Sequence, residues 1–295
     1  MSTVELPGMP APGPLYRRAA LTLVPGIGAA RRGTTLPDVE LAVRAVPVDR
    51  DRLADYDQVC GFRLSDVLPA TFPHVMGFPL ALRLMTAPDF PIALAGIVHI
   101  ANRIVMRRPI FAGEVLDFAV RAADLRPHAR GRQLDIVLTA SVEGVEVWRG
   151  VSTYLSRERT TAPAARAERA ASAAPTPAGP AAPAAPAGSV ASNWWRVEPR
   201  VGTDYARVSG DHNPIHTSRL GARLFGFRHP IAHGMWSKAR CLAALDGRLP
   251  EAYTVDVAFK AALPLPSTVA FTAVPGWTFA LHSAAGKPHL TGTVG

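Results

Sequence analysis

Two stretches of the chain show the same order of patterns, an apolar helical run followed by segments in which apolar and polar residues alternate. The run 80–85 predicts a short apolar helix. In 235–245, Met235, Ala239 and Leu242 recur at helical spacing and predict a second, amphipathic helix. Strands are expected at 97–105, 114–122, 133–142 and 145–155 after the first helix, and at 253–259, 268–274, 279–283 and 290–294 after the second. Each half therefore predicts one helix and an antiparallel sheet, an α+β layer.

A segment of different composition separates these halves. Between Thr160 and Ser189, 14 of 30 residues are Ala and 6 are Pro. The prolines exclude a continuous helix, and the segment lacks residues that could form a core. We therefore expect an N-terminal unit at residues 1–159, an Ala/Pro-rich linker at 160–191 and a C-terminal unit at 192–295.

The two units resemble diverged copies of one another. Residues 56–62 align with 205–211, residues 78–82 with 229–233, and residues 109–115 with 263–269. Each match is short, but all three occur in the same order, which indicates an internal repeat. The alignment places Phe62 opposite Asp211 and Val67 opposite His216.

Composition and charge narrow the classes of function. Hydrophobic residues make up 48% of the chain, and the formal net charge is +9. Residues 192–295 contain 11 Lys and Arg against 6 Asp and Glu, an excess that suits a phosphate-bearing small molecule or an acidic carrier protein. The sequence has no basic run with interleaved aromatics and no zinc-finger spacing, so we do not expect a nucleic-acid partner.

Cysteine content and hydropathy indicate a compartment. The two cysteines, Cys60 and Cys241, are too few for a disulfide framework, and we expect buried free thiols in a reducing environment. No stretch reaches the roughly 18 apolar residues of a membrane-spanning helix. We therefore expect a cytoplasmic protein without a membrane span.

Two sequence segments carry the candidate chemistry. Residues 205–216 read Tyr-Ala-Arg-Val-Ser-Gly-Asp-His-Asn-Pro-Ile-His, and residues 225–235 read Phe-Gly-Phe-Arg-His-Pro-Ile-Ala-His-Gly-Met. Together they resemble the MaoC-like family, the hydratase 2 or (R)-specific enoyl-CoA hydratases. The signature of that family is an Asp, then Asn-Pro-[Ile/Leu]-His, then Pro-Ile-x-His-Gly-Met. In this specific form the resemblance covers about residues 195–270.

The resemblance implies a double hot dog fold, in which two fused units each wrap an antiparallel sheet around a long helix. In longer members of the family only one unit carries the catalytic residues. Because Phe62 and Val67 stand at the positions aligned with Asp211 and His216, we expect the N-terminal unit to be non-catalytic. Its expected role is to complete the paired sheet and to shape the acyl pocket. A homodimer of such double hot dogs is a further possibility.

The resemblance also implies an activity, the reversible hydration of trans-2-enoyl-CoA to (R)-3-hydroxyacyl-CoA in fatty acid metabolism. Asp211 and His216 would hold one water between them and act as acid and base. Pro214 prevents a regular helix between them, so we expect both to project from a turn that Asn213 holds, unless Asn213 binds the water. By resemblance, the backbone N–H of Gly234 at the start of a helix is the oxyanion donor.

Neighbouring residues have more modest expected roles. Residues expected to line the substrate site are Ser209, Pro230, His233 and Met235. The alternative for His233 is a purely structural role, in which it packs beside the site and hydrogen-bonds a carbonyl. No metal is expected, because Pro214 and Pro230 interrupt the two histidine pairs with i,i+4 spacing, His212/His216 and His229/His233. No cofactor is expected either, since a CoA thioester would be the substrate.

Two alternatives remain beside the hydratase. A 3-hydroxyacyl-carrier-protein dehydratase of fatty acid synthesis would share the active site and differ in its carrier. A non-catalytic acyl-thioester binding protein or scaffold belongs to a different class. The complete set of Asp211, Asn213, His216 and Gly234 argues against the binder, because binding alone has no need of a paired acid and base.

Overall fold

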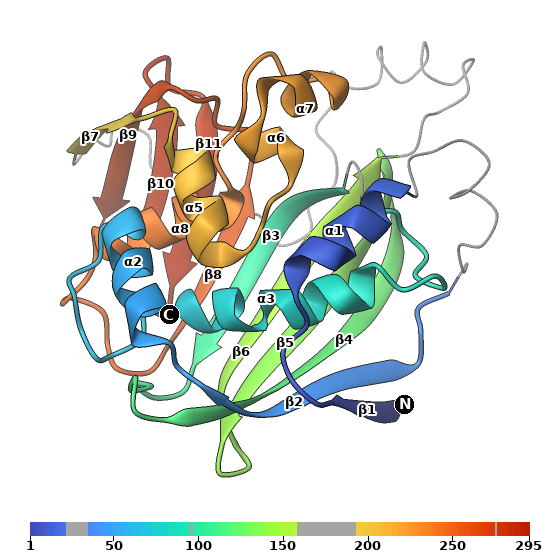
Figure 1. Ribbon diagram of the computed structural model, residues 1–295. Helices are drawn as coiled ribbons and strands as arrows, with labels where there is room; N and C mark the ends of the chain where they lie inside the picture. The colour runs from blue at the N-terminus through green and yellow to red at the C-terminus, as the bar shows by residue number, and fades with distance from the viewer. Residues whose placement is uncertain (22–34, 95–96, 158–192, 275) are drawn as a thin grey trace.

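One continuous sheet forms the frame of the structure. The computed structural model describes residues 1–21, 35–94, 97–157, 193–274 and 276–295. Within these residues the strands form an 11-stranded sheet in the order β1-β2-β4-β5-β6-β3-β8-β11-β10-β9-β7 (Figure 1). Paired strands run antiparallel, except that β1 and β2 are parallel. The linker expected at 160–191 lies outside the described residues.

The N-terminal unit contributes six strands and three helices in the part of the chain that the structure describes. The strands are β1 (Ser2–Leu6), β2 (Val39–Pro47), β3 (Ile97–Met106), β4 (Val115–His128), β5 (Gly131–Val142) and β6 (Val145–Arg157). The helices are α1 (Pro12–Leu21), α2 (Arg50–Cys60) and α3 (Phe72–Met85). The four expected strands are present, and β4 extends several residues beyond the predicted end. Helix α3 lies across the face of β4 and β5, and α1 lies over α3 (Figure 1).

The C-terminal unit contributes five strands and four helices among the described residues. The strands are β7 (Asn193–Val197), β8 (Tyr253–Phe259), β9 (Ser267–Val274), β10 (Thr278–Ser283) and β11 (Pro288–Val294). The helices are α5 (Val201–Ser209), α6 (Pro214–Thr217), α7 (Arg219–Leu224) and α8 (Gly234–Ala243). The four expected strands and the expected helix are present. No described helix has the length and apolar character needed to cross a membrane.

The two units meet where β3 pairs with β8. The register runs from Ala101 opposite Ala258 to Met106 opposite Tyr253. A buried cation reinforces this β3–β8 junction: Lys238 of α8 is fully buried, and its ammonium donates to the Asn102 side-chain oxygen at 2.6 Å and to the carbonyls of Asn102 and Val255 at 3.2 Å each. Burial lowers the pKa of Lys238 well below its usual range. The junction therefore makes one sheet from two half-sheets.

Helix α3 is longer than the sequence predicted, because it begins at Phe72 instead of residue 80. The first half contains Pro73, Gly77 and Pro79, which weaken a helical pattern. Pro79 has no N–H to donate to the Val75 carbonyl, and the Arg52 guanidinium donates to that carbonyl at 3.4 Å instead. Arg52 also donates to the Val208 carbonyl in α5 at 2.8 Å, so one side chain links both units.

The internal repeat is present, but its alignment was wrong beyond the first segment. Gly61 and Gly210 both end a helix in the left-handed conformation, which agrees with the first aligned segment. Beyond them, isolated bridges pair Val67 with Phe111 in one unit and Ile231 with Pro264 in the other. The structural counterpart of Val67 is therefore Ile231, and that of Phe111 is Pro264. The aligned pair of Val67 and His216 is corrected. The alignment of 78–82 with 229–233 is corrected as well, and that of 109–115 with 263–269 was off by one residue.

This correction exposes an insertion. Between the matched glycine and the matched bridge, the N-terminal unit has only residues 62–66, whereas the C-terminal unit has residues 211–230. The extra length forms α6 and α7, for which the N-terminal unit has no equivalent among its described residues. Asp211, which aligns with Phe62, begins this longer segment, and His216 lies within it. Residues 211–229 are called the inserted segment below. The scaffold is thus shared, and the candidate acid and base are an addition to one copy.

Candidate active site

The start of the inserted segment is a turn built by its own side chains. The Ser209 hydroxyl accepts from the Asp211 N–H at 3.1 Å, and Asp211 Oδ1 accepts from the Asn213 N–H at 3.1 Å. Asn213 Oδ1 then accepts from the Ile215 N–H at 3.3 Å and caps α6. Of the two roles expected for Asn213, these contacts provide the one of holding the turn.

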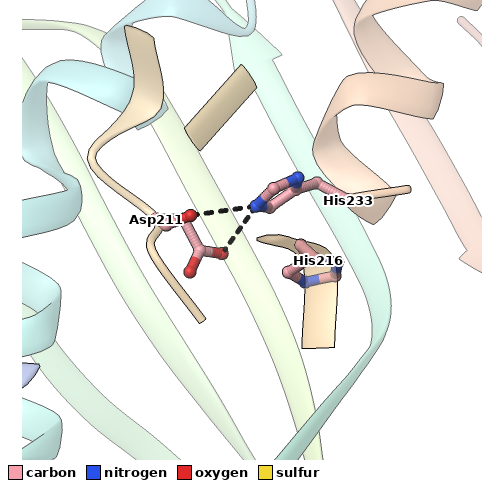
Figure 2. A group of neighbouring side chains, drawn as sticks. All are labelled: Asp211, His216 and His233. Carbon is pink, nitrogen blue, oxygen red and sulfur yellow. Dashed lines mark hydrogen bonds and ion pairs between the residues drawn. The ribbon is translucent and has the colours of Figure 1, made fainter. Parts of the chain in front are cut away.

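No regular helix joins Asp211 to His216, as predicted, because residues 211–213 are not helical. Pro214 also has a second effect: it occupies the first position of the one-turn helix α6, where a missing N–H is tolerated, and His216 lies on that helix. His216 therefore projects from a short helix and not from the turn itself. The turn and α6 together bring the Asp211 and His216 side chains to the same side of the segment (Figure 2).

Three side chains meet at the centre of the site. Figure 2 shows His233, which precedes α8, pointing toward Asp211 with His216 beside it. The imidazole rings of His216 and His233 stack with centroids 3.7 Å apart. One polar atom from each of Asp211, His216 and His233 lies within 4.8 Å of the others. That spacing is short enough for one small species, such as a water molecule, to contact both Asp211 and His216.

Hydrogen bonds to carbonyls fix the tautomers of both neutral imidazoles. A carbonyl oxygen can only accept, so His216 Nδ1, 2.7 Å from the Ile231 carbonyl, carries the proton and Nε2 keeps its lone pair. His233 Nε2 lies 3.0 Å from the Asp211 carbonyl and carries the proton for the same reason. Burial lowers the pKa of His216, and it lowers the pKa of His233 to about 3. At neutral pH His216 is thus a free base, whereas His233 is a neutral donor.

Asp211 remains ionised in this setting. Burial pushes the pKa of its carboxyl upward, but the nearby His233 and His216 and the hydrogen bonds from Tyr16 and Asn213 outweigh burial and hold the pKa below its usual range. The Tyr16 hydroxyl donates to Asp211 Oδ1 at 2.6 Å. Sequence reasoning missed Tyr16, since it lies 195 residues before Asp211 and belongs to no motif.

A cavity of about 420 Å³ opens onto this cluster. It is lined from the C-terminal unit by Ser209, Asp211, Asn213, His216, His233, Gly234, Met235 and Phe259, among others. The N-terminal unit contributes an apolar portion of the lining, which includes Val75, Phe78, Met85, Leu94, Ile97 and Leu155. Both units therefore build the cavity.

The remaining expected site residues fall into two groups. Ser209, His233 and Met235 line the cavity, and His233 also makes the carbonyl hydrogen bond that its alternative role required. Pro230 is not among the lining residues. Its carbonyl accepts from the Leu265 N–H at 2.8 Å and so holds the loop before α8.

Gly234 lies where a helix begins and where space is tight. It is the first residue of α8 and lines the cavity. A Cβ at this position would lie 3.0–3.2 Å from ring carbons of Phe259, closer than most such contacts. The first N–H groups of a helix have no partner within the helix, so this end of α8 presents donors beside the cluster.

The spacing of Asp211, His216 and His233 would also suit a metal ion. The triad combines Asp211 with one histidine from each of the two i,i+4 pairs, a combination that histidine spacing alone does not predict. The tautomers oppose coordination, however, because the nitrogen of His233 that faces Asp211 carries a proton. We therefore retain the prediction that the site works without a metal.

Comparisons with known proteins agree with the fold. Residues 183–274 match the MaoC-like domain family. The chain is 36% identical over 279 residues to 3-hydroxyacyl-thioester dehydratase X of Mycobacterium tuberculosis, and the match covers 93% of each chain. The crystal structure of HtdX from M. tuberculosis superposes with a TM-score of 0.74 at 34% identity, covering 86% of this chain and 98% of that one. A MaoC-like dehydratase structure at 18% identity has a TM-score of 0.66 and covers 90% and 98%.

The chain belongs to the MaoC-like dehydratase family and has its double hot dog fold. It is accordingly a hydro-lyase, an enzyme that adds or removes water. The family and the fold expected from the sequence are thereby confirmed.

Proposed function

We propose that the chain catalyses the reversible addition of water to a trans-2-enoyl thioester, which gives the (R)-3-hydroxyacyl thioester. The observation that carries the proposal is the pairing of a carboxylate and an imidazole, with an oxygen and a ring nitrogen within 4.8 Å of each other, at a cavity that both units line. The similarity to a protein named 3-hydroxyacyl-thioester dehydratase supports the thioester substrate. The (R) configuration rests on resemblance to the family.

Asp211 and His216 would share the proton transfers. The Asp211 carboxylate and His216 Nε2 are both proton acceptors at neutral pH, because the pKa of each is held low. A water held between them gives one proton to this pair as its oxygen bonds to C3. The pair delivers one proton to C2, so the double bond gains H and OH and the enzyme returns to its starting state. Each well-placed acid or base typically contributes about 100- to 10,000-fold.

The start of α8 would stabilise the charge that develops on the thioester oxygen. Addition to C3 pushes negative charge onto that oxygen, and unpaired N–H groups at a helix start stabilise it. Gly234 is the first residue of α8 and has no side chain of its own to shield its N–H. This role for Gly234 is part of the proposal, and Gly234→Ala tests it because the added Cβ would press on Phe259.

The cavity lining suggests how the two ends of the substrate are placed. The apolar residues of the N-terminal unit suit an acyl chain, since burying each methylene contributes about 0.8 kcal/mol. Arg130 and Lys260 are exposed cations that also line the cavity. They suit the phosphates of CoA or of a carrier protein's phosphopantetheine arm, and neither carrier is favoured over the other by this chemistry.

The test is direct assay of the purified chain with trans-2-enoyl-CoA substrates of several chain lengths. Hydration removes the conjugated double bond, so absorbance of the enoyl thioester should fall, and chiral analysis of the product should give the (R) isomer. The same acyl groups on carrier protein identify the preferred carrier. Absence of turnover with both carriers, for protein with native circular dichroism, would refute the proposal, and an (S) product would refute its stereochemistry.

A further inference from the structure

The N-terminal arm of the chain, β1 and α1, reaches the candidate active site of the other unit. Leu15 of α1 packs with Phe78 and Leu82 of α3 in a small buried cluster separate from the main core. Tyr16, the next residue, packs against that cluster and also lines the cavity. Helix α1 is thus anchored on α3 beside the inserted segment of the C-terminal unit (Figure 1).

Tyr16 makes a short hydrogen bond to the candidate acid/base pair. Its hydroxyl donates to Asp211 Oδ1 at 2.6 Å, which lies in the range of charge-assisted bonds between a hydroxyl and a carboxylate. Burial, followed by the charge of Asp211, raises the pKa of Tyr16, so the phenol stays protonated and remains a donor. The ring also meets His212 edge-on, with centroids 6.3 Å apart.

The two oxygens of Asp211 consequently have different surroundings. Oδ1 accepts from both the Tyr16 hydroxyl and the Asn213 N–H. Oδ2 faces His233 Nε2 at 3.9 Å, too far for a hydrogen bond, and the described residues give it no closer donor. One oxygen is therefore occupied by the protein, and the other is available to a water molecule.

We propose that Tyr16 is a positioning residue that fixes Asp211 through Oδ1, so that Oδ2 holds the reacting water next to His216. The inference rests on the proposed hydration activity and deepens it. It assigns the contact with water to one carboxylate oxygen of Asp211. It also gives the N-terminal arm a role in catalysis, although the acid and the base themselves lie in the C-terminal unit. Without this bond the carboxylate can rotate about its Cβ–Cγ bond and lose its alignment with the water.

Tyr16→Phe tests the bond, because it removes only the hydroxyl. Loss of a hydrogen bond to a charged group should lower kcat about 10-fold or more. KM should stay within about threefold, because the acyl pocket is unchanged. Tyr253→Phe is the matched control, since Tyr253 of β8 is outside the cavity lining and its variant should retain wild-type kcat. Melting temperatures of both variants show whether the fold is equally intact.

A second replacement separates the hydrogen bond from the bulk of the ring. Incorporation of 3-fluorotyrosine at position 16 keeps a phenol that is a stronger donor, so kcat should stay within about threefold of the wild type. Unchanged kcat in Tyr16→Phe would overturn the inference, as would a rise in KM alone or an equal loss with 3-fluorotyrosine. A wild type inactive on enoyl thioesters would refute the proposed function and the inference with it, whereas an active wild type with an unaffected Tyr16→Phe refutes the inference alone.

Discussion

The two units of the molecule share one scaffold and differ most in the segment that follows the helix-ending glycine of each unit. Between the helix-ending glycine and the matched bridge, the N-terminal unit passes directly through residues 62–66. The C-terminal unit inserts residues 211–229 at that place, and the insertion carries Asp211, Asn213 and His216. The candidate acid and base thus lie in a loop of a packed scaffold, and the loop disturbs neither the sheet nor the long helix.

The N-terminal unit has the longer elements instead. Helix α3 has 14 residues and α8 has 10. Strands β4, β5 and β6 have 14, 12 and 13 residues, whereas β9, β10 and β11 have 8, 6 and 7. Longer strands and a more apolar helix enclose more volume, and this unit supplies part of the apolar cavity lining. One copy therefore holds the candidate acid and base, and both copies supply the wall.

The largest expected effects come from removing the acid/base pair of the inserted segment. Asp211→Asn and His216→Ala should each lower kcat by about 100-fold or more, because each removes a proton acceptor. Steady-state assays with an enoyl thioester, together with circular dichroism, measure the loss. His229→Ala is the matched control, because His229 lies exposed in the same segment and should be dispensable. Near-normal turnover in either site variant would contradict the assignment of the acid and base to this segment.

The next largest effect concerns the β3–β8 junction, where the two copies become one sheet. Asn102→Leu removes the side-chain oxygen 2.6 Å from the fully buried Lys238 ammonium. Leaving a buried cation short of a partner should lower the free energy of unfolding by about 3 kcal/mol. Adding Lys238→Met should recover much of that loss, because the cation itself is then gone. Urea unfolding of both single variants and the double variant measures the coupling.

An exposed ion pair at the same junction provides the control. Arg103 and Asp256 lie 2.6 Å apart, and both are about half exposed. Because surface pairs are worth about 0–1 kcal/mol, Arg103→Ala should change stability little. Equal losses in Arg103→Ala and Asn102→Leu would contradict the view that the buried cation, not the exposed pair, holds the halves together.

A smaller effect is expected on the pH dependence of stability, through His74, a histidine that the N-terminal unit contributes to the cavity wall. Burial, with the charge of Lys238, lowers the pKa of His74 to about 4, whereas an unfolded histidine titrates near 6.5. Between these values the unfolded chain binds more protons, so stability falls as pH drops from 6.5 toward 4. The loss is about 1 kcal/mol per pH unit for one such group. His74→Leu should therefore lose less stability than wild type between pH 7 and pH 5.

Urea unfolding at those two pH values measures the difference. His229→Ala again serves as the control for removal of a histidine, because the His229 side chain is exposed. An identical pH dependence in His74→Leu and wild type would show that His74 does not lose its charge on folding.

Much of the fold could be predicted from periodicity, but not all of it. Eight strands with strong alternation or apolar runs were predicted near their observed bounds. The first half of α3 was not, because Pro73, Gly77 and Pro79 interrupt its pattern, and Arg52 of another helix compensates at the Val75 carbonyl. Contacts between distant helices do not appear in a local pattern.

The residues of the candidate site also divide into those that the sequence could predict and those that it could not. Asp211, Asn213 and His216 are close in sequence and could be found from their motif. Tyr16 could not, because a hydrogen bond across 195 residues has no local signature. The wrong pairing of Val67 with His216 had a related cause: short apolar matches cannot locate an insertion, whereas the bridges to Phe111 and Pro264 do so directly.

The smallest expected effect is that of removing metal ions. Asp211, His216 and His233 are close enough to hold an ion, but coordination needs a lone pair from each ligand. His233 Nε2 carries a proton toward the Asp211 carbonyl, and Asp211 Oδ1 already accepts from Tyr16. Extensive chelation followed by elemental analysis should leave full activity in metal-free protein. A loss of activity that zinc or another divalent ion restores would contradict this prediction and show that His233 turns to bind metal. The C-terminal unit would then differ from the N-terminal unit by a metal centre, and not only by an acid and a base.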